Sequence, residues 1–389
     1  MPDHRRAFLK SAIAAGAASY SRILGANDRI RLAGLGTGGR CTYLLGLAAR
    51  EPGTDIAAVC DVYEPKLRIV KEKVAPAAQE YLDYRQVLER KDLDAVIIGS
   101  PDHWHVPMTM DAVRAGKDVY VEKPVSHNIE EGAQLEKIVA ASRQIVQVGY
   151  QQRSWDHFKF AREVVRSGRL GKISLIIASW YQDYLSRMRV AEIETAKLDW
   201  KKFFGNAPDQ PFDALRFTRW RWFWDFGGGH LTDLYSHYGD VIQWYMDSYS
   251  PTSVVSIGTR NAIPRFECPD TLTTAYEYPG FQITYHGSLV GSLDGGNILF
   301  RGSEGMMKLN RDGFAVYPEH VVPFEKTNYP EPEISMRSAR DGAIDHMRNF
   351  LDCVRSRKAP NATVKDAVAI ARAAHLGNQA FRKGALVEG

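Results

Sequence analysis

Apolar and polar positions follow two alternating periods in the first 150 residues. Short apolar runs occur directly before Gly34 and at 55–61, 93–99, 118–122 and 144–149. Helix-like segments stand among them at 43–50, 108–115 and 130–142. Buried strands that alternate with amphipathic helices predict a doubly wound parallel sheet, whose ligands gather at the carboxyl ends of the strands.

The pattern changes after residue 150. A helix is expected at 156–166, and strand-like stretches follow at 173–178, 254–258, 271–278, 282–287, 297–301 and 306–310. Their alternation indicates a sheet with one covered face, so we expect it to be mostly antiparallel. Residues 179–228 form a long, irregular aromatic connection of a kind that is usually functional. Two further helices are expected at 343–354 and 365–381.

Length and composition set the broad class. A chain of 389 residues is too long for one ordinary core, so we expect two domains. Its 25% charged and 44% apolar residues are typical of a soluble globular protein, and no apolar run is long enough to span a membrane. Three of the four net positive charges lie in residues 1–26, which leaves no basic patch for nucleic acid. The four cysteines form no Cys-x-x-Cys pair, and we expect them to be free.

The glycine pattern after the first apolar run is the most informative candidate site. Gly34, Gly36 and Gly39 form Gly-x-Gly-x-x-Gly between a predicted strand and a predicted helix. In a dinucleotide fold the three glycines serve, in order, a tight turn, the approach of a pyrophosphate to bare backbone, and close packing of the helix on the sheet. The loop residues expected at the cofactor are Gly34, Gly36, Thr37, Gly38, Gly39 and Arg40.

Asp61 indicates which dinucleotide binds. It ends the second apolar run, 22 positions after Gly39, near the offset of about 20 residues at which a carboxylate bonds the adenosine ribose. The same carboxylate would repel a 2′-phosphate. We therefore expect NAD as the cofactor, with NADP disfavoured.

Residues 1–26 have the features of an export signal. Arg5 and Arg6 precede Phe-Leu-Lys, a mildly apolar stretch follows, and small residues near Ala26 offer a cleavage site. The paired arginines indicate the twin-arginine route and a periplasmic location. Free NAD is not maintained outside the cytoplasm, so such an enzyme would hold its cofactor tightly. The alternative is an amphipathic first helix with incidental arginines.

A lysine follows the strand predicted at 118–122, in the triplet Glu122-Lys123-Pro124. At this edge of the sheet an ammonium group could bond a substrate hydroxyl and stabilise its oxygen as hydride leaves the carbon. The alternative is a surface Glu–Lys pair that caps the strand.

A second polar group lies between Gly229 and Asp240. If a helix begins near Gly229, then Asp233 and His237 are i and i+4 on one face. A carboxylate that fixes its tautomer would suit the imidazole to remove a hydroxyl proton. Two alternatives are an ordinary polar helix cap and a metal site made with His230. We expect the acid–base pair and no metal.

Aromatic residues crowd the connection before this segment. They are Tyr181, Tyr184, Trp200, Trp220, Trp222 and Trp224. Aromatic faces pack against the C–H faces of sugar or cyclitol rings, while arginines bond hydroxyls. Tyr181, Arg219 and Trp222 are therefore expected to contact substrate. The alternative is that the tryptophans cover a strand face or a subunit contact.

Three motifs, in this order and spacing, resemble the Gfo/Idh/MocA oxidoreductases, relatives of glucose-fructose oxidoreductase and inositol dehydrogenase. They are the glycine pattern at 34–39, the triplet Glu122-Lys123-Pro124, and the pair Asp233 and His237. The resemblance covers nearly the whole chain from Asn27. It implies a Rossmann domain followed by a domain with a large, mostly antiparallel open sheet. It also implies that Lys123 contacts the reacting hydroxyl and that His237 with Asp233 is the acid–base pair. Further cofactor contacts that it implies are Ser100, His105, Glu122, Lys123 and Gln151.

The expected organisation is an export leader at 1–26, an NAD-binding Rossmann domain at 27–150, a substrate domain at 151–345, and C-terminal helices at 346–389 that pack back on the core. The expected activity is oxidation of a sugar, glycoside or cyclitol hydroxyl with a retained NAD, in a cycle that could be redox-neutral overall. Alternatives are an NAD-dependent glycosidase working through transient oxidation and a non-catalytic sugar-binding protein that retains NAD. A homo-oligomer, dimer or tetramer, is expected through the C-terminal sheet.

Overall fold

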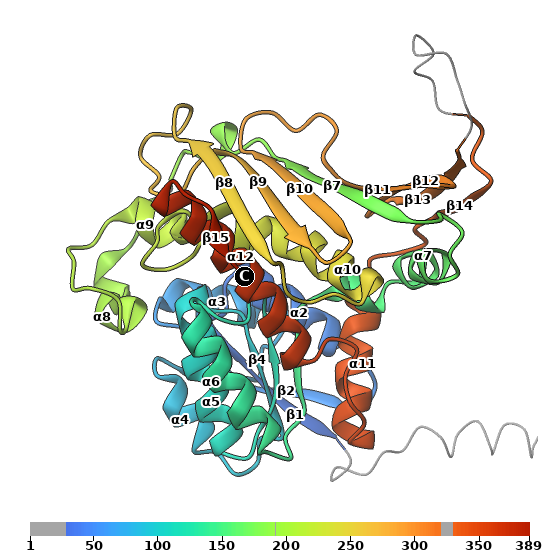
Figure 1. Ribbon diagram of the computed structural model, residues 1–389. Coiled ribbons are helices and arrows are strands. Elements are labelled where there is room, and N and C mark those ends of the chain that lie inside the picture. The colour runs from blue at the N-terminus through green and yellow to red at the C-terminus, as the bar shows by residue number, and fades with distance from the viewer. Residues whose placement is uncertain (1–28, 191, 320–329) are drawn as a thin grey trace, which may run out of the picture.

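Two sheets organise the molecule. The computed structural model in Figure 1 describes residues 29–190, 192–319 and 330–389, and the predicted leader at 1–26 lies outside them. A six-stranded parallel sheet fills the lower part of the view, and a nine-stranded sheet lies above it. The expected fold class, a Rossmann-type parallel sheet followed by a large, mostly antiparallel sheet, is confirmed.

The parallel sheet is built from the apolar runs of the first 150 residues. In spatial order its strands are β3 (Gln79–Tyr81), β2 (Thr54–Cys60), β1 (Ile30–Leu35), β4 (Ala95–Ile98), β5 (Asp118–Val121) and β6 (Val146–Val148). The connecting helices are α2 (Gly39–Ala48), α3 (Glu64–Lys73), α4 (Tyr84–Leu88), α5 (His105–Arg114) and α6 (Ile129–Ala140). Strand β3 was not predicted, because its three residues are exposed or half-buried and make no apolar run. The order reverses between β1 and β4, where a doubly wound sheet binds its ligand.

The second sheet pairs strands that are far apart in the chain. Its spatial order is β14 (Ile334–Arg337), β13 (Gly313–Pro318), β12 (Gly305–Asn310), β11 (Gly296–Gly302), β7 (Ile173–Tyr181), β10 (Phe281–Ser288), β9 (Thr271–Tyr278), β8 (Ser253–Thr259) and β15 (Val387–Glu388). Among the described strands of this second sheet, β7 and β10 are the only neighbours that run parallel. The short strands β14 and β15 carry too few residues for a readable alternation, and they were not predicted.

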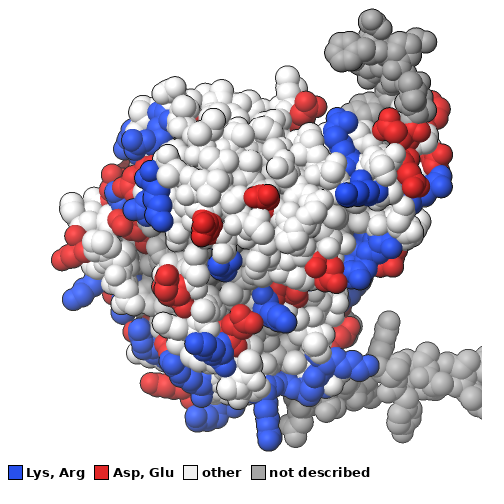
Figure 2. Space-filling model, viewed as in Figure 1, with Lys and Arg blue, Asp and Glu red and all other residues white. Residues whose placement is uncertain are grey.

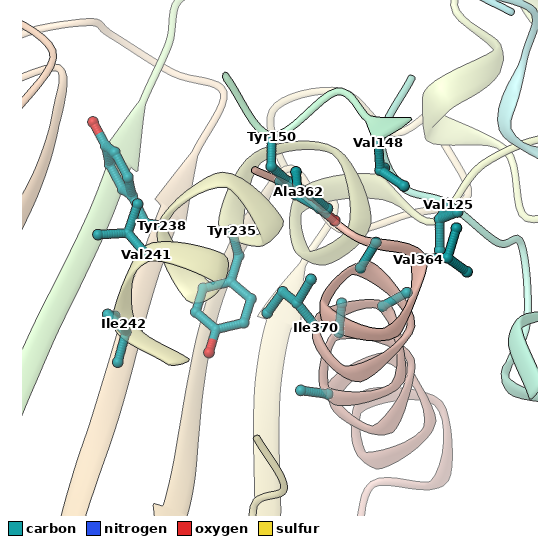
Figure 3. Close-up of a cluster of buried hydrophobic side chains, with 14 of the residues drawn as sticks. Val125, Val148, Tyr150, Tyr235, Tyr238, Val241, Ile242, Ala362, Val364 and Ile370 are labelled. Atoms are coloured by element: carbon teal, nitrogen blue, oxygen red, sulfur yellow. The ribbon is translucent and has the colours of Figure 1, made fainter. Parts of the chain in front are cut away.

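Helices of the second half join the two sheets. Helix α7 (Asp156–Arg166) packs beside β13, and α11 (Gly342–Ser356) packs against α2 and the short helix η3 (Gln151–Ser154). Helix α12 (Val364–Lys383), red in Figure 1, contacts α6 of the lower layer and β8 of the upper sheet. Figure 3 shows the apolar cluster at this junction, where Ile370 of α12 lies near Tyr235. Val148, the last residue of β6, belongs to the same cluster.

A buried ion pair fixes the same junction. Arg153 of η3 contacts Asp240 of α10 (Ser236–Met246) through its Nε at 2.9 Å, and Asp366 of α12 through its NH1 at 3.3 Å. One guanidinium therefore ties three elements together, and removing it would leave buried carboxylates unpaired.

Two further properties follow from the described residues. All four cysteines are buried and free, as expected. Within the described ranges, none of the helices combines the length and apolarity that a membrane crossing requires.

Candidate active site

The glycine loop begins at the carboxyl end of β1, and its glycines serve different purposes from those expected. Gly36 has a φ of +72°, and a Cβ there would lie 2.6 Å from the Cα of Ser100. A Cβ at Gly34 would lie 2.6 Å from a methyl group of Leu45 in α2, whereas at Gly39 nothing lies within 4 Å. The tight turn thus depends on Gly36 and the helix–strand packing on Gly34, so the roles predicted for Gly34 and Gly39 are wrong.

A groove of about 360 Å³ runs along this loop. Its lining includes Gly36, Gly38, Gly39 and Arg40, with Asp61 beyond the end of β2. Asp61 is 6% exposed and accepts a hydrogen bond from the backbone N–H of Tyr63 at 3.0 Å. The hydroxyl of the buried Thr37 lies 3.4 Å from the same carboxylate. This is a preformed acceptor at the place where an adenosine ribose would lie.

The other wall of the groove comes from residues 198–222, which we call the covering segment. It contains α8 (Trp200–Phe204), α9 (Ala214–Thr218) and η6 (Trp220–Trp222), where sequence reasoning expected irregular chain. The carbonyl oxygen of Phe203 lies 2.8 Å from Trp104 Nε1 and 2.9 Å from His103 Nε2. At the start of the segment, the backbone N–H of Asp199 donates to the carbonyl oxygen of Val62 at 2.9 Å. The segment is therefore bonded across the nucleotide-binding edge of the parallel sheet.

A smaller cavity of about 200 Å³ continues the groove inward. Groove and cavity share Arg40, Gly99, Ser100, Trp220 and Arg221 in their linings. The cavity is also lined by Asp102, His105, Glu122, Lys123, Gln151, His237 and Arg311. The structure thus brings most of the predicted catalytic and cofactor residues to one connected space.

Lys123 is anchored by the second half of the chain. Its Nζ donates to the Asp233 carboxylate at 2.7 Å and to the Asp233 backbone carbonyl at 2.8 Å. The preceding Glu122 is held separately, since its carboxylate accepts from Arg40 Nε at 2.8 Å. Burial alone would raise the pKa of Glu122, but Arg40 and Lys123 outweigh it and lower that pKa. The lysine and the glutamate are not a surface pair, because both are nearly buried.

Asp233 pairs with cations rather than with the imidazole. Its Oδ1 accepts from Lys123 and also from Arg221 Nε at 3.2 Å, and none of the described hydrogen bonds joins Asp233 to His237. Burial opposes ionisation, yet these two cations lower the pKa of Asp233 to about 2. The expected carboxylate–imidazole pair is therefore wrong. Residues Leu231–Tyr235 form a π-helical turn, which alters the i, i+4 relation that the prediction assumed.

His237 is a neutral base candidate surrounded by positive charge. The residue is 8% exposed, its ring stacks on Trp180 with centroids 5.7 Å apart, and its Nδ1 is buried without a hydrogen-bond partner. Burial lowers the pKa of His237 well below its usual value, and the charges of Lys123, Arg311 and Arg40 lower it further. A neutral imidazole can accept a proton from a hydroxyl in the cavity.

His105 and Gln151 support the cavity wall. The ring nitrogens of His105 lie 2.6 Å from Pro124 O and 3.0 Å from Ser100 O, and burial lowers its pKa to about 4. His105 thus links the loops that follow β4 and β5. The Gln151 side-chain oxygen lies 3.5 Å from Arg40. The buried Ser100 hydroxyl has no partner among the described residues, which fits a cofactor contact at this point.

Three predicted substrate residues lie elsewhere. Trp222 is 0% exposed and stacks on Phe266, so the prediction that it contacts substrate is wrong; the alternative that it covers a packed face applies. Arg219 lines the groove and not the inner cavity. Tyr181 lines an outer recess that meets the cavity only at Arg311.

Three cavity residues escaped the site prediction. Asp102 is 3% exposed, and burial raises its pKa well above the usual value. Arg221 binds Asp233, and Arg311 lies in the turn between β12 and β13. None of them stands in a recognisable linear motif, and only the pairing of distant elements brings them together.

The metal alternative has no support in the geometry. His230 turns to Asp270 O at 3.1 Å and to Tyr285 Oη at 3.3 Å, away from Asp233. In the part of the chain that the structure describes, no three His, Cys, Asp or Glu side chains are grouped to hold a metal ion.

Comparison with known proteins agrees with this arrangement. Residues 29–150 match the family model "Oxidoreductase family, NAD-binding Rossmann fold", and residues 158–308 match "GFO/IDH/MocA C-terminal domain". The fold resembles scyllo-inositol dehydrogenase from Lactobacillus casei with bound NAD(H) and scyllo-inositol, with a TM-score of 0.68 and 20% identity over 92% of this chain and 99% of that one.

Two curated relatives show similarity over shorter stretches. Glycosyl hydrolase family 109 protein 1 of Shewanella sp. (strain ANA-3) is 30% identical over 34% of this chain and 36% of its own length. The 1-carboxy-3-chloro-3,4-dihydroxycyclohexa-1,5-diene dehydrogenase of Comamonas testosteroni is 28% identical over 54% of this chain and 50% of its own. The chain thus spans between a third and a half of the length of these relatives.

Both models describe the same family, and together they match most of the chain. The glycine loop, the order of the parallel strands and the open second sheet are consistent with that match. The chain therefore belongs to the Gfo/Idh/MocA oxidoreductases, with an NAD-binding Rossmann fold.

Proposed function

We propose that this protein oxidises a hydroxyl group of a sugar or cyclitol and keeps its NAD bound between turnovers. The observation that carries the proposal is the shared cavity of about 200 Å³, in which Lys123 and His237 meet beside the groove of the glycine loop. An ammonium group and a neutral imidazole in one enclosed space are the two groups that alcohol oxidation needs from a protein.

The chain's own residues divide the work at the hydroxyl. Lys123, held on Asp233, donates a hydrogen bond to the hydroxyl oxygen and stabilises negative charge there. His237 takes the hydroxyl proton, and Trp180 fixes the plane of its ring. NAD, when bound along Gly36 and Asp61, supplies the hydride acceptor.

Two features support NAD as a retained cofactor. The Asp61 carboxylate at the ribose position disfavours a 2′-phosphate. The covering segment forms the second wall of the groove, so it would contact a bound dinucleotide from the side opposite the glycine loop. The inositol dehydrogenase of similar fold, which was crystallised with NAD(H) and scyllo-inositol, supports a polyhydroxylated ring as substrate.

The proposal is tested on protein purified without added nucleotide. We expect NAD or NADH in the heat-released supernatant, and reduction of the bound nicotinamide when inositols or hexoses are added. Lys123→Ala should lower the rate of that reduction about 1000-fold and leave the cofactor in place. The exposed Lys172→Ala is the matched control and should react like the parent.

Unchanged turnover in Lys123→Ala would contradict the proposed role. A protein that retains NAD and binds sugars, yet never reduces the nicotinamide, would instead be the non-catalytic sugar-binding alternative. If the purified protein holds no NAD or NADH, the proposal that the cofactor stays bound between turnovers fails.

A second candidate function is glycoside cleavage through transient oxidation. The similarity to a glycosyl hydrolase family 109 protein favours it over other redox-neutral cycles. Such a reaction requires removal of a proton next to the transient ketone. Solvent deuterium should then appear at the adjacent ring carbon of the product, and its absence would eliminate this candidate.

Export and assembly remain proposals. Export by the twin-arginine route rests on residues 1–26, and Arg5→Lys with Arg6→Lys should leave the protein in the cytoplasmic fraction.

Assembly through the nine-stranded sheet is favoured by the broad uncharged area above its β8–β10 strands in Figure 2 and by the exposed Ile257 of β8. Sedimentation of Ile257→Lys against the parent tests whether that face is an interface.

A further inference from the structure

Arg311 is an uncompensated cation in the candidate active site. It lines the cavity that holds Lys123 and His237, and none of the ion pairs among the described residues includes it. Its Nε is shielded from solvent and has no hydrogen-bond partner. Its guanidinium lies over the ring of Trp180, at 4.9 Å from the ring centroid, and Trp180 in turn stacks on His237.

The turn that carries Arg311 is firmly built. Asn310 accepts hydrogen bonds from the backbone N–H groups of Asp312 and Gly313 at 2.9 and 3.2 Å. Its amide nitrogen donates to Asn297 of the neighbouring strand at 3.2 Å, and its carbonyl lies 3.0 Å from His157. The backbone on both sides of Arg311 is thus fixed, so its side chain enters the cavity from a rigid support.

The charges around the cavity leave a positive excess. Four cations (Arg40, Lys123, Arg221 and Arg311) face two carboxylates, since Glu122 pairs with Arg40 and Asp233 serves both Lys123 and Arg221. Asp102 also lines the cavity, where burial raises its pKa well above the usual value, so at most three carboxylates face the four cations. Burial also lowers the pKa of Arg311, yet a guanidinium remains protonated. A half-buried guanidinium that lines the cavity without an ion-pair partner is a suitable contact for an anionic group of a ligand.

The cofactor is not the natural partner of Arg311. Arg40 and Arg221 line both groove and cavity, so the pyrophosphate of NAD could offset their charges. Arg311 lines the cavity and the outer recess but not the groove. In that recess the exposed Asp294 and Asp312 would repel an anion, which leaves the inner side, toward His237, as the place where one fits.

We propose that the substrate is a polyhydroxylated ring that carries a carboxylate, with Arg311 as the residue that selects for it. The proposal deepens the proposed function and rests on it. A planar guanidinium matches a carboxylate in shape and in single charge, and a neutral ring would leave Arg311 unpaired. A bound carboxylate would also offset one of the three cations, Lys123, Arg311 and Arg40, that lower the basicity of His237.

The test compares ring-matched pairs on the NAD-loaded protein. D-Glucuronate is set against D-glucose, and D-galacturonate against D-galactose, with D-glucuronamide as a neutral isostere and glucose 6-phosphate as a dianion. Reduction of the bound nicotinamide reports turnover, and quenching of tryptophan fluorescence, in which Trp180 takes part, reports binding. We expect the carboxylates to exceed their neutral partners about 100-fold in kcat/KM.

Arg311→Gln should lower kcat/KM for the carboxylates about 100-fold more than for the neutral sugars, and Arg311→Lys should restore part of the preference. Arg301→Gln, an exposed arginine on β11, is the matched control for the loss of one charge in the same sheet. A general loss of packing at position 311 would instead lower the rates of charged and neutral sugars together, and would count against a selective role.

Three results overturn the inference. They are a preference for neutral sugars, a preference for the phosphate, or a carboxylate preference that persists in Arg311→Gln. Any of them with nicotinamide reduction intact leaves the proposed function standing. If no sugar reduces the nicotinamide, the proposed function fails, and the fluorescence titration alone decides: tighter binding of the carboxylates, lost in Arg311→Gln, supports the charge selection, and equal or absent binding rejects it.

Discussion

Asp233 sets the electrostatics at the reacting hydroxyl by serving two cations at once. It holds Lys123 at 2.7 Å and Arg221 at 3.2 Å, and the same pairing keeps its carboxylate ionised in a buried position. His237 receives no negative neighbour of this kind, so burial and nearby cations keep it neutral. In the proposed reaction, the Lys123 side chain therefore lies where a negative oxygen would develop, and the imidazole is free to accept the proton.

This division predicts the acid side of the pH profile. His237 must be neutral to accept a proton, and its pKa lies below the usual histidine value of about 6.5. Activity should therefore persist as the pH falls through about 6.5 and disappear only at a lower pH. The measurement is kcat/KM against pH for a substrate without titrating groups, such as an inositol.

Two variants assign that limb to the imidazole. His237→Gln should lose activity about 1000-fold, and its residual rate should lack the acid limb. His286→Gln, on β10 and outside the cavity, should retain the parent profile. An acid limb at or above pH 6.5 would contradict the proposed environment of His237.

At the scale of elements, the covering segment closes the cofactor groove from the second half of the chain. Gly205, which directly follows α8, has a φ of +57°, and a Cβ there would overlap the indole of Trp104. The same indole donates a hydrogen bond to the carbonyl oxygen of Phe203, so the covering segment is tightly packed against the parallel layer at this place. Retention of the cofactor should depend on it.

Gly205→Ala should therefore release NAD faster, by about 10- to 100-fold, because the overlap displaces α8 from Trp104. Gly116→Ala is the matched control: its φ is +77°, but nothing lies within 4 Å of the added Cβ. Both variants place a side chain at a residue with positive φ, and only the first adds the overlap with Trp104. The rate of nucleotide release during dilution measures the difference, and equal rates would show that the segment does not hold the cofactor.

At the scale of the whole molecule, buried histidines help to join distant segments. His346 of α11 lies 2.9 Å from Val148 O and 2.6 Å from the Ser154 hydroxyl, and His375 of α12 lies 3.1 Å from Ser126 O. Burial lowers the pKa of both to about 4. These contacts join the C-terminal helices to the parallel layer, and burial makes protonation of either ring unfavourable.

Acid should therefore weaken the fold as these rings take up protons. Burial lowers the pKa of four histidines to about 4 in the folded protein. They are His105, His230, His346 and His375. Each takes up a proton more readily when unfolded, so each removes up to about 1.4 kcal/mol of unfolding free energy per pH unit as the pH falls from about 6.5 toward 4. Asp240, with its pKa raised to about 6 mainly by burial, opposes part of this loss.

Urea denaturation at a series of pH values measures the slope. His375→Gln should reduce it by one histidine's share, whereas His286→Gln, half-buried on β10, serves as the control. A free energy of unfolding that does not change between pH 7 and about 5 would contradict the assignment of neutral, buried rings.

Five strands of the parallel sheet were predictable because each signal is local, whereas β3, α3 and α4 were not predicted. The glycine loop, Asp61 and Lys123 each follow an apolar run, and parallel strands present their carboxyl ends at one edge. Placement of His237 at the same site followed from the family resemblance and agrees with the cavity lining. By contrast, the roles of Gly34 and Gly39 could not be separated by spacing alone, because they depend on which side chain of α2 packs over which glycine.

The sequence by itself determined the two kinds of sheet, the nucleotide loop and the chemical types available at the site, since periodicity and motif spacing are properties of neighbouring residues. Only the tertiary structure decided the partners: Asp233 on Lys123 and Arg221, Trp222 inside a core, and Arg311 in the cavity. The physical reason is that charge pairing and burial depend on distances between elements. A π-helical turn, or the pairing of strands far apart in the chain such as β7 and β11, changes those distances without changing any local pattern.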